Sequence, residues 1–130
     1  MDDNLELNEE QLNTIELILT EELITLGVRT VLLIDMAGNI IANLDDGKTS
    51  FDVYSLAALA AGNFGAVSAM AEIIGEKDFS ILFHKGEKEN IHFTKVNQDL
   101  LLITVFEQKI SLGFLRMKVA EAVKRIQKLM

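Results

Sequence analysis

Hydrophobic residues recur at helical spacing in three segments of the chain, and the segments between them alternate or run continuously. A first helix is predicted over residues 8–27, because Asn8 can cap its start and Gln11 can close a capping box. The same spacing predicts helices over residues 52–75 and 111–129. The remaining apolar segments predict strands at residues 30–35, 40–44, 79–84, 91–96 and 100–106.

The strand patterns indicate how the sheet is arranged. Residues 30–35 and 100–106 are apolar on both faces and should lie centrally, whereas residues 91–96 include polar side chains and should lie further out. Short connections favour antiparallel neighbours. We expect an α/β fold of the α+β, profilin-like kind, with one five-stranded antiparallel sheet and the order α-β-β-α-β-β-β-α. We expect residues 1–130 to form a single domain, with residues 1–7 as an acidic, disordered start.

The helix predicted over residues 52–75 has two apolar faces of different kinds. One face carries residues suited to cover a sheet: Val53, Leu56, Ala60, Phe64, Val67, Ala71 and Ile74. Roughly 180° away lies a row that we call the small stripe, with Ala61 beside it: Ala58, Gly62, Gly65 and Ala69. Each mid-helix glycine costs about 0.5–1 kcal/mol relative to alanine. Close approach of a partner would offset this cost; the alternative is burial inside the chain's own domain.

Composition restricts the function classes. A chain of 130 residues has room for one core, and the absence of cysteine excludes disulfides and thiolate chemistry. The net charge of −8 argues against nucleic acid. The acidic start lacks the basic region of a secretory signal, and we expect no apolar run near the ~20 residues of a membrane span. These features predict a cytoplasmic protein without membrane insertion.

Charge is distributed unevenly between the two ends. Residues 1–28 contain eight acids and no base, whereas residues 109–130 contain six bases and one acid. The basic end could meet an anionic partner or a membrane surface. The preferred interpretation is that the first and last helices lie side by side, with contacts from Leu19 and Leu23 to Val119 and Val123.

The segment Gly47-Lys48-Thr49 lies between a predicted strand and a predicted helix, where a phosphate-binding loop would end. The motif needs a glycine five residues before Gly47, and that position is Ala42. Asp45 and Asp46 would repel a phosphate, and they lack the alternating oxygen ligands of a calcium loop. We therefore expect an ordinary loop.

Two histidines, His84 and His92, flank the predicted hairpin and could face each other across the strands. Without a third ligand they make no convincing metal site, so we interpret them as surface-strand histidines. No serine, aspartate and histidine spacing suggests an activated nucleophile. We expect no enzyme activity, no cofactor and no metal.

The pattern resembles the roadblock family, which is named for dynein-associated light chains and includes bacterial MglB-type regulators of Ras-like GTPases. Four landmarks carry the resemblance, and together they span about residues 8–129. They are Val31 to Ala42, the alanine-rich segment Leu56 to Asn63, Lys85-Gly86-Glu87, and Leu112-Gly113-Phe114-Leu115-Arg116.

The resemblance implies a homodimer whose sheet continues across the subunit boundary through the third strand, at Phe79, Ser80, Ile81, Leu82 and Phe83. It also implies that the middle helix lies beside its symmetry mate on one sheet face, with the terminal helices on the other. The paired middle helices would form a platform for a small GTPase. The small stripe and Ala61 would then contact the mate, the GTPase or both.

These observations favour a non-enzymatic, dimeric adaptor or regulator of a Ras-like GTPase. The only bases on or beside the middle helix are Lys48 and Lys77, so no arginine is placed to act on a bound nucleotide. One alternative is a small-molecule sensory domain, although the sequence shows no convergent polar groups on an apolar wall. Another is a motor or signalling light chain without a GTPase partner.

Overall fold

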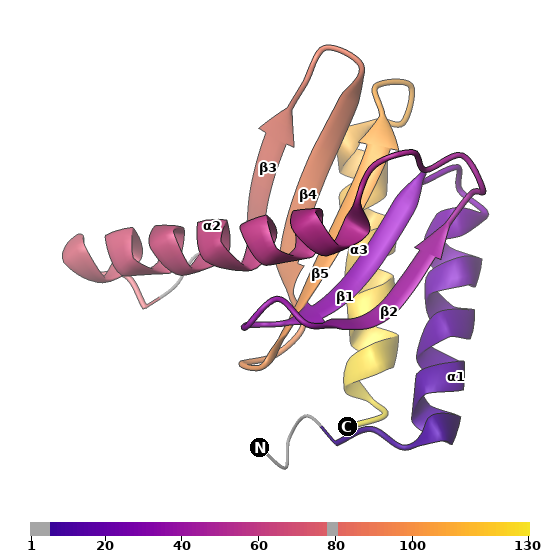
Figure 1. The fold of residues 1–130 in the computed structure, drawn as a ribbon, viewed down its shortest axis with the longest axis horizontal. Helices are drawn as coiled ribbons and strands as arrows, with labels where there is room; N and C mark the ends of the chain where they lie inside the picture. Colours follow the sequence, from indigo (N-terminus) through magenta and orange to yellow (C-terminus); the bar gives the residue numbers. More distant parts are fainter. Residues whose placement is uncertain (1–5, 78–80) are drawn as a thin grey trace.

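The computed structural model describes residues 6–77 and 81–130, and its elements follow the predicted order (Figure 1). A π-helical turn, η2, continues the first helix. The elements are α1 (Glu9–Leu19), η2 (Thr20–Ile24), β1 (Thr30–Asp35), β2 (Ile40–Asp45), α2 (Val53–Ile73), β3 (Ile81–Lys85), β4 (Glu89–Lys95), β5 (Leu100–Glu107) and α3 (Leu112–Gln127). Most of the predicted disordered start, and the predicted strand residues Phe79 and Ser80, lie outside the described residues.

The five strands form one antiparallel sheet in the order β2-β1-β5-β4-β3. The predicted central strands, β1 and β5, are paired with each other, with Leu33 opposite Leu102. Their side chains are buried on both faces because helices cover both sides of the sheet (Figure 1). The strand order thus confirms the predicted fold class and leaves β3 at one edge.

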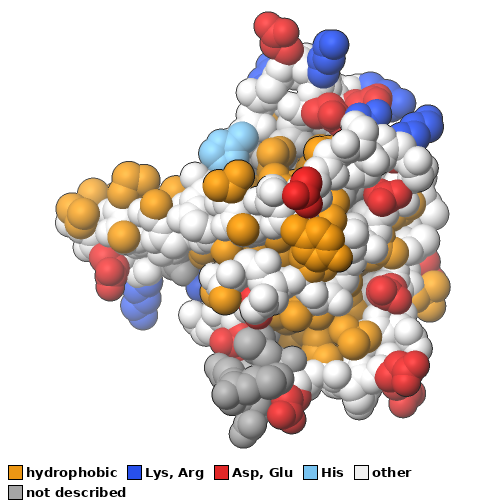
Figure 2. Space-filling model, in the orientation of Figure 1, with side chains coloured by type: hydrophobic (Ala, Val, Ile, Leu, Met, Phe, Trp, Pro, Cys, Tyr) orange, Lys and Arg blue, Asp and Glu red, His pale blue; other side chains and the backbone are white. Residues whose placement is uncertain are grey.

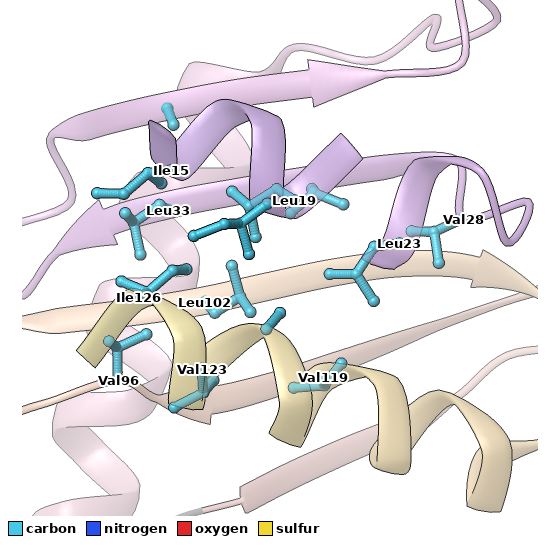
Figure 3. Close-up of a cluster of buried hydrophobic side chains, with 14 of the residues drawn as sticks. Ile15, Leu19, Leu23, Val28, Leu33, Val96, Leu102, Val119, Val123 and Ile126 are labelled. Atoms are coloured by element: carbon cyan, nitrogen blue, oxygen red, sulfur yellow. The ribbon is translucent and has the colours of Figure 1, made fainter. Parts of the chain in front are cut away.

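The terminal helices share one face of the sheet, as predicted. Leu19 and Leu23 belong to the same buried cluster as Val119 and Val123, above the β1 and β5 side chains (Figure 3). Ion pairs join the same helices: Arg125 Nη1 lies 3.1 Å from Glu21 Oε2, and Lys118 Nζ lies 3.7 Å from Glu22 Oε1. The complementary charges of the two chain ends therefore meet within the chain.

The start of the first helix forms the predicted capping box. Asn8 Oδ1 accepts from the Gln11 backbone N–H at 2.7 Å, and Gln11 Oε1 accepts from the Asn8 N–H at 3.0 Å. The single predicted helix is instead two segments, because the α-helical hydrogen bonds give way to η2. Gly27 then turns the chain with φ of +107°, a left-handed conformation that favours glycine.

The β1–β2 turn packs against α2. Asp35 Oδ1 accepts from the N–H groups of Ala37 and Asn39, which fixes the turn. Gly38 has φ of +93°, and a Cβ added to it would lie 3.1 Å from Ala58 Cα. Glycine therefore serves two purposes here, a left-handed turn and a close backbone approach to α2.

The α2 helix lies alone on the other face of the sheet and extends past its β3 edge (Figure 1). Asp52 caps its start, and Gly75, with φ of +86°, follows its end. Its buried residues are Ala57, Ala60, Phe64 and Ala71. Ile74 was predicted on the core face but is exposed. This prediction was wrong because helical spacing does not show where the underlying sheet ends.

The length and composition of α2 correct the expectation that no apolar segment approaches the length of a membrane span. Residues Val53–Ile73 form a helix long and apolar enough to cross a membrane by those two criteria alone. In this fold the helix lies across a sheet, and Ala57, Ala60 and Phe64 pack on β-strand side chains. Most of its remaining apolar surface faces outward.

Candidate partner-binding surface

The small stripe lies on the exposed side of α2. Ala58, Gly62, Gly65 and Ala69 are all exposed, and Ala61 is half-buried. A Cβ added to Gly62 or to Gly65 would meet nothing within 4 Å. The chain's own backbone approaches the stripe at Ala58, through the Gly38 turn. Burial inside the chain's own domain therefore does not explain the two mid-helix glycines.

A second apolar surface on α2 consists of large side chains that the sequence analysis did not single out. Leu59 is 73% exposed, Met70 55% and Ile73 84%. Figure 2 shows hydrophobic side chains along the part of α2 that extends from the body of the molecule. Contiguous exposed apolar surface of this kind marks an interaction site in a folded protein.

An apolar hollow of 420 Å³ lies between the start of α2 and the ends of β4 and β5. Its lining combines four apolar side chains with three polar ones: Phe51, Leu56, Ile91, Val105, Asp52, Ser55 and Glu89. Hydrogen bonds from the Ser55 hydroxyl and the Tyr54 backbone N–H lower the pKa of Asp52. No sequence pattern indicated this hollow, because the loop, helix and strands that line it are far apart in the chain.

The β3 strand forms the sheet edge expected from the family resemblance. Among the described strands it pairs only with β4, with Leu82 opposite Phe93 and Phe83 opposite His92. Leu82 packs toward the α2 face, and Phe83 packs toward the terminal helices. The outer side of β3 therefore offers backbone groups for a further strand.

The two histidines lie on opposite faces of the sheet and do not face each other. His84 is exposed, and its ring lies against Phe93 on the α2 face. His92 is only 1% exposed, and burial, followed by the charge of Arg116, lowers its pKa to about 4. The interpretation of His92 as a surface histidine was wrong. Its side chain lies on the sheet face that the terminal helices cover, and alternation along the strand does not show which face is covered.

The loop before α2 is not built to hold a phosphate. Asp45 Oδ1 accepts from the Gly47 N–H at 2.6 Å, and Asp46 Oδ1 accepts from the Lys48 N–H at 2.9 Å. These are the backbone donors that a phosphate would need. Across residues 6–77 and 81–130, no group of three or more His, Asp or Glu side chains is placed to hold a metal ion.

The fold and the exposed α2 helix agree with a known domain family. The family model of the Roadblock/LC7 domain matches residues 14–106, which is more than half of the chain. The chain belongs to the Roadblock/LC7 domain family. No curated protein sequence matches this Roadblock/LC7 domain.

Solved structures similar to this Roadblock/LC7 domain include bacterial MglB proteins. Myxococcus xanthus MglB is 30% identical, with a TM-score of 0.87 and coverage of 96% of this chain and 93% of that one. The gliding protein mglB of Thermus thermophilus is 27% identical, with a TM-score of 0.88 and coverage of 99% and 97%. Acanthamoeba castellanii profilin II, at 17% identity and a TM-score of 0.59, covers 85% of this chain and 94% of its own and shares the fold.

Proposed function

We propose that this Roadblock/LC7 domain is a non-enzymatic homodimeric adaptor or regulator that binds a Ras-like small GTPase on its paired α2 helices. Family membership and the similarity to MglB proteins support a regulatory role. The exposed edge of β3 supports pairing with a second copy. Because one similar structure is described as a gliding protein, we propose cell polarity or motility as its setting.

One observation carries the proposal: the small stripe is exposed, and space is open around Gly62 and Gly65. Glycines that cost helix stability without serving this chain's own packing are explained by a partner whose backbone comes close. A flat, small-residue surface suits a folded protein partner better than a small ligand, since it offers no concavity.

The proposed role requires no catalytic group from this chain. Lys48 and Lys77 are exposed bases near the two ends of α2, and the helix itself contains no arginine. An effect on GTP hydrolysis would therefore come from ordering the switch regions of the GTPase, which carry its own catalytic residues.

The test is a pull-down with the full-length chain from native cytoplasm supplemented with a non-hydrolysable GTP analogue. The captured small GTPase is then purified and its affinity measured for the wild type, Gly65→Arg and Ala61→Arg. We expect both arginine variants to lose binding, because a large charge on the stripe clashes and is desolvated without a partner. Unchanged affinity in both variants would refute the proposed surface.

A second candidate function, small-molecule sensing, is favoured by the apolar hollow beside α2 and its two carboxylates. A ligand that binds only the folded chain raises its melting temperature. Thermal melting against a metabolite and nucleotide panel, without any GTPase, distinguishes the two functions. A specific shift that Ile91→Gln removes would support the sensor.

A further inference from the structure

The outer surface of α3 carries apolar and basic side chains on one side of the helix. Phe114 and Met117, in its first two turns, are 43% and 48% exposed. Lys124 and Lys128, at its other end, are exposed as well. At 100° per residue these four side chains fall within about 80° of one another, on the side away from the sheet. We call them the basic face.

The bases of α3 fall into two groups. Lys118 and Arg125 form ion pairs with glutamates of η2. By contrast, Arg116, Lys124 and Lys128 have no carboxylate within ion-pair distance among residues 6–77 and 81–130. Arg116 is exposed and lies at the edge of the basic face. Because the chain contains 20 acids and only 12 bases, this unpaired positive charge on one helix does not follow from composition.

One acid lies within the basic face, and its charge is offset within the same helix. Glu121 Oε2 lies 3.6 Å from Lys118 Nζ. The same Nζ lies 6.0 Å from the centroid of the Phe114 ring, over its face. Lys118 therefore neutralises the acid and also holds the exposed ring in place through a cation–π contact. The basic face keeps a net positive charge beside an ordered apolar pair.

The helix macrodipole accounts for only part of this arrangement. Cations are favoured near a helix C-terminus, which is sufficient to explain Lys124 and Lys128. It does not explain the unpaired Arg116 near the start of α3, or the exposure of Phe114 and Met117 to water. Apolar side chains beside unpaired bases are typical of a surface that binds a partner of opposite charge.

We infer that the basic face binds an acidic amphipathic helix of another protein. Met117 and Lys124 are about two helical turns apart, and Lys124 and Lys128 are about one turn apart. The partner would pack apolar side chains on Phe114 and Met117 and place two carboxylates, one turn apart, against the lysines. This inference does not rest on the proposed function, because α3 and α2 lie on opposite faces of the sheet (Figure 1).

The neighbouring helix restricts the width of the partner. The α1 helix lies beside α3 on the same face of the sheet, and its exposed side chains include Glu9, Glu10 and Glu16 (Figure 1). A broad anionic membrane that reached Lys124 would also come close to these carboxylates, and the like charges would repel. A single helix that lies along α3 avoids them. Charge complementarity therefore favours an acidic helix over a membrane.

The test measures binding of a defined probe to the full-length chain by fluorescence anisotropy. The probe is an alanine-rich peptide about 18 residues long, enough to form a helix, with two leucines and, two turns away on the same side, two glutamates. It is made in both sequence orders, because a partner can run in either direction along α3. We expect one order to bind in the micromolar range and more weakly at high salt.

The matching peptide with lysines in place of the glutamates is the control and should not bind. Failure of both glutamate peptides to bind at about 1 mM would overturn the inference. Equal binding of the lysine peptide would also overturn it, because the contact would then not depend on opposite charge.

Two pairs of variants locate the site. Lys124→Glu should weaken peptide binding about tenfold, whereas Lys88→Glu, the same charge change on an exposed lysine of the β3–β4 hairpin, should change it less than about twofold. Met117→Gln should weaken binding several-fold, whereas Leu17→Gln, at a position 56% exposed on α1, should have little effect. Equal effects within either pair would mean an unspecific attraction and would overturn the inference. All four positions are exposed, so melting temperatures should stay close to that of the wild type.

Other occupants of the basic face give different results. If vesicles of equal parts phosphatidylcholine and phosphatidylserine retain the chain while neither peptide binds, the face belongs to a membrane and the inference fails. If light scattering shows assemblies larger than a dimer that Lys124→Glu dissociates, the face belongs to a second copy and the inference fails as well.

The proposed GTPase contact on α2 is tested separately. Lys124→Glu should leave GTPase binding unchanged, and Gly65→Arg should leave peptide binding unchanged, because the two sites lie on opposite sides of the sheet. A GTPase that loses affinity for Lys124→Glu would occupy the basic face itself and would overturn the inference. Peptide binding that survives in a chain with no GTPase partner would support the inference while the proposed function fails.

Discussion

The helices cover the two faces of the sheet to different degrees. On one face, α1, η2 and α3 cover the strands, bury a large continuous cluster and pair their opposite charges across the helix boundary. On the other face, α2 alone covers a smaller cluster, and its large apolar residues Leu59, Met70 and Ile73 remain exposed. The covered face explains why the chain folds. The open face is the reason for proposing a partner.

From this difference we propose that stability and recognition of a GTPase depend on separate layers of one small domain. Substitutions on the covered face should change unfolding, because each removes packed contacts. Substitutions on the outer side of α2 should change association, because within one chain those side chains contact little. Four predictions test this separation, from the largest expected effect to the smallest.

The largest effect is expected for Phe106→Ala on the covered face. Phe106 is fully buried in β5, and its ring stacks on Phe83 with centroids 6.3 Å apart. The cavity and the lost contacts should cost about 3–5 kcal/mol in urea unfolding. The control is Tyr54→Ala on exposed α2, which should change stability by less than about 0.5 kcal/mol. Equal losses in both variants would contradict the comparison.

The second prediction concerns pH and the buried His92, which contacts Thr94 at 3.1 Å through Nδ1. Burial, followed by the Arg116 charge, lowers its pKa from 6.5 to about 4, so the folded chain binds fewer protons than the unfolded chain between these values. Stability should therefore fall as pH falls from 6.5 to about 4, by on the order of 3 kcal/mol.

Urea unfolding of the wild type and His92→Leu across this pH range isolates the histidine, because carboxylate titration is common to both. The wild type should lose more stability than the variant on acidification. Parallel curves for the two proteins would mean that His92 does not titrate differently in the folded state.

The third prediction concerns Gly38, where the β1–β2 turn contacts the open-face helix. Gly38→Ala should cost about 1–2 kcal/mol from its left-handed backbone alone, and more from the approach of Ala58 Cα. Gly47→Ala is the matched control, since φ is +84° there but a Cβ would meet nothing within 4 Å. If both variants unfold at the same urea concentration, the close approach of Ala58 adds nothing to the loss of stability in Gly38→Ala.

The smallest effect, with the opposite sign, is expected for Gly62→Ala on the small stripe. A Cβ there meets nothing, so alanine should stabilise the chain by about 0.5–1 kcal/mol through its higher helix propensity. The same variant should bind the proposed GTPase partner more weakly, because the added methyl group would hold the partner backbone away. A variant that is both more stable and fully competent in binding would show that the glycine serves no contact.

Local chemistry and periodicity were sufficient to predict the elements that contact neighbours within this chain. The Asn8 capping box and the central strands follow from caps and spacing, and the shared face of the terminal helices follows from the opposite charges of the two chain ends. The exposure of Ile74 and the burial of His92 could not be predicted in this way. Each depends on how far a covering element extends over its neighbour, which is set by three-dimensional packing.

The candidate surface was predicted only in part. The small stripe could be predicted from the sequence, because glycines inside a helix reduce its stability and therefore call for an explanation. The exposure of Leu59, Met70 and Ile73 was not predicted, because large apolar residues in a helix ordinarily belong to the core. Their exposure becomes visible only when the sheet beneath α2 is seen to end at β3 (Figure 1).

The position of Gly62 and Gly65 at the middle of α2 has a consequence for dynamics. Beyond Phe64 the helix buries only Ala71, so its outer half gains little from tertiary packing. Backbone amides in that half should exchange their hydrogens with solvent by local opening, while those over the sheet exchange only through larger unfolding. Binding of a partner would protect the amides in the outer half of α2 from exchange. Amide exchange along α2 would therefore measure how much of this surface a partner covers.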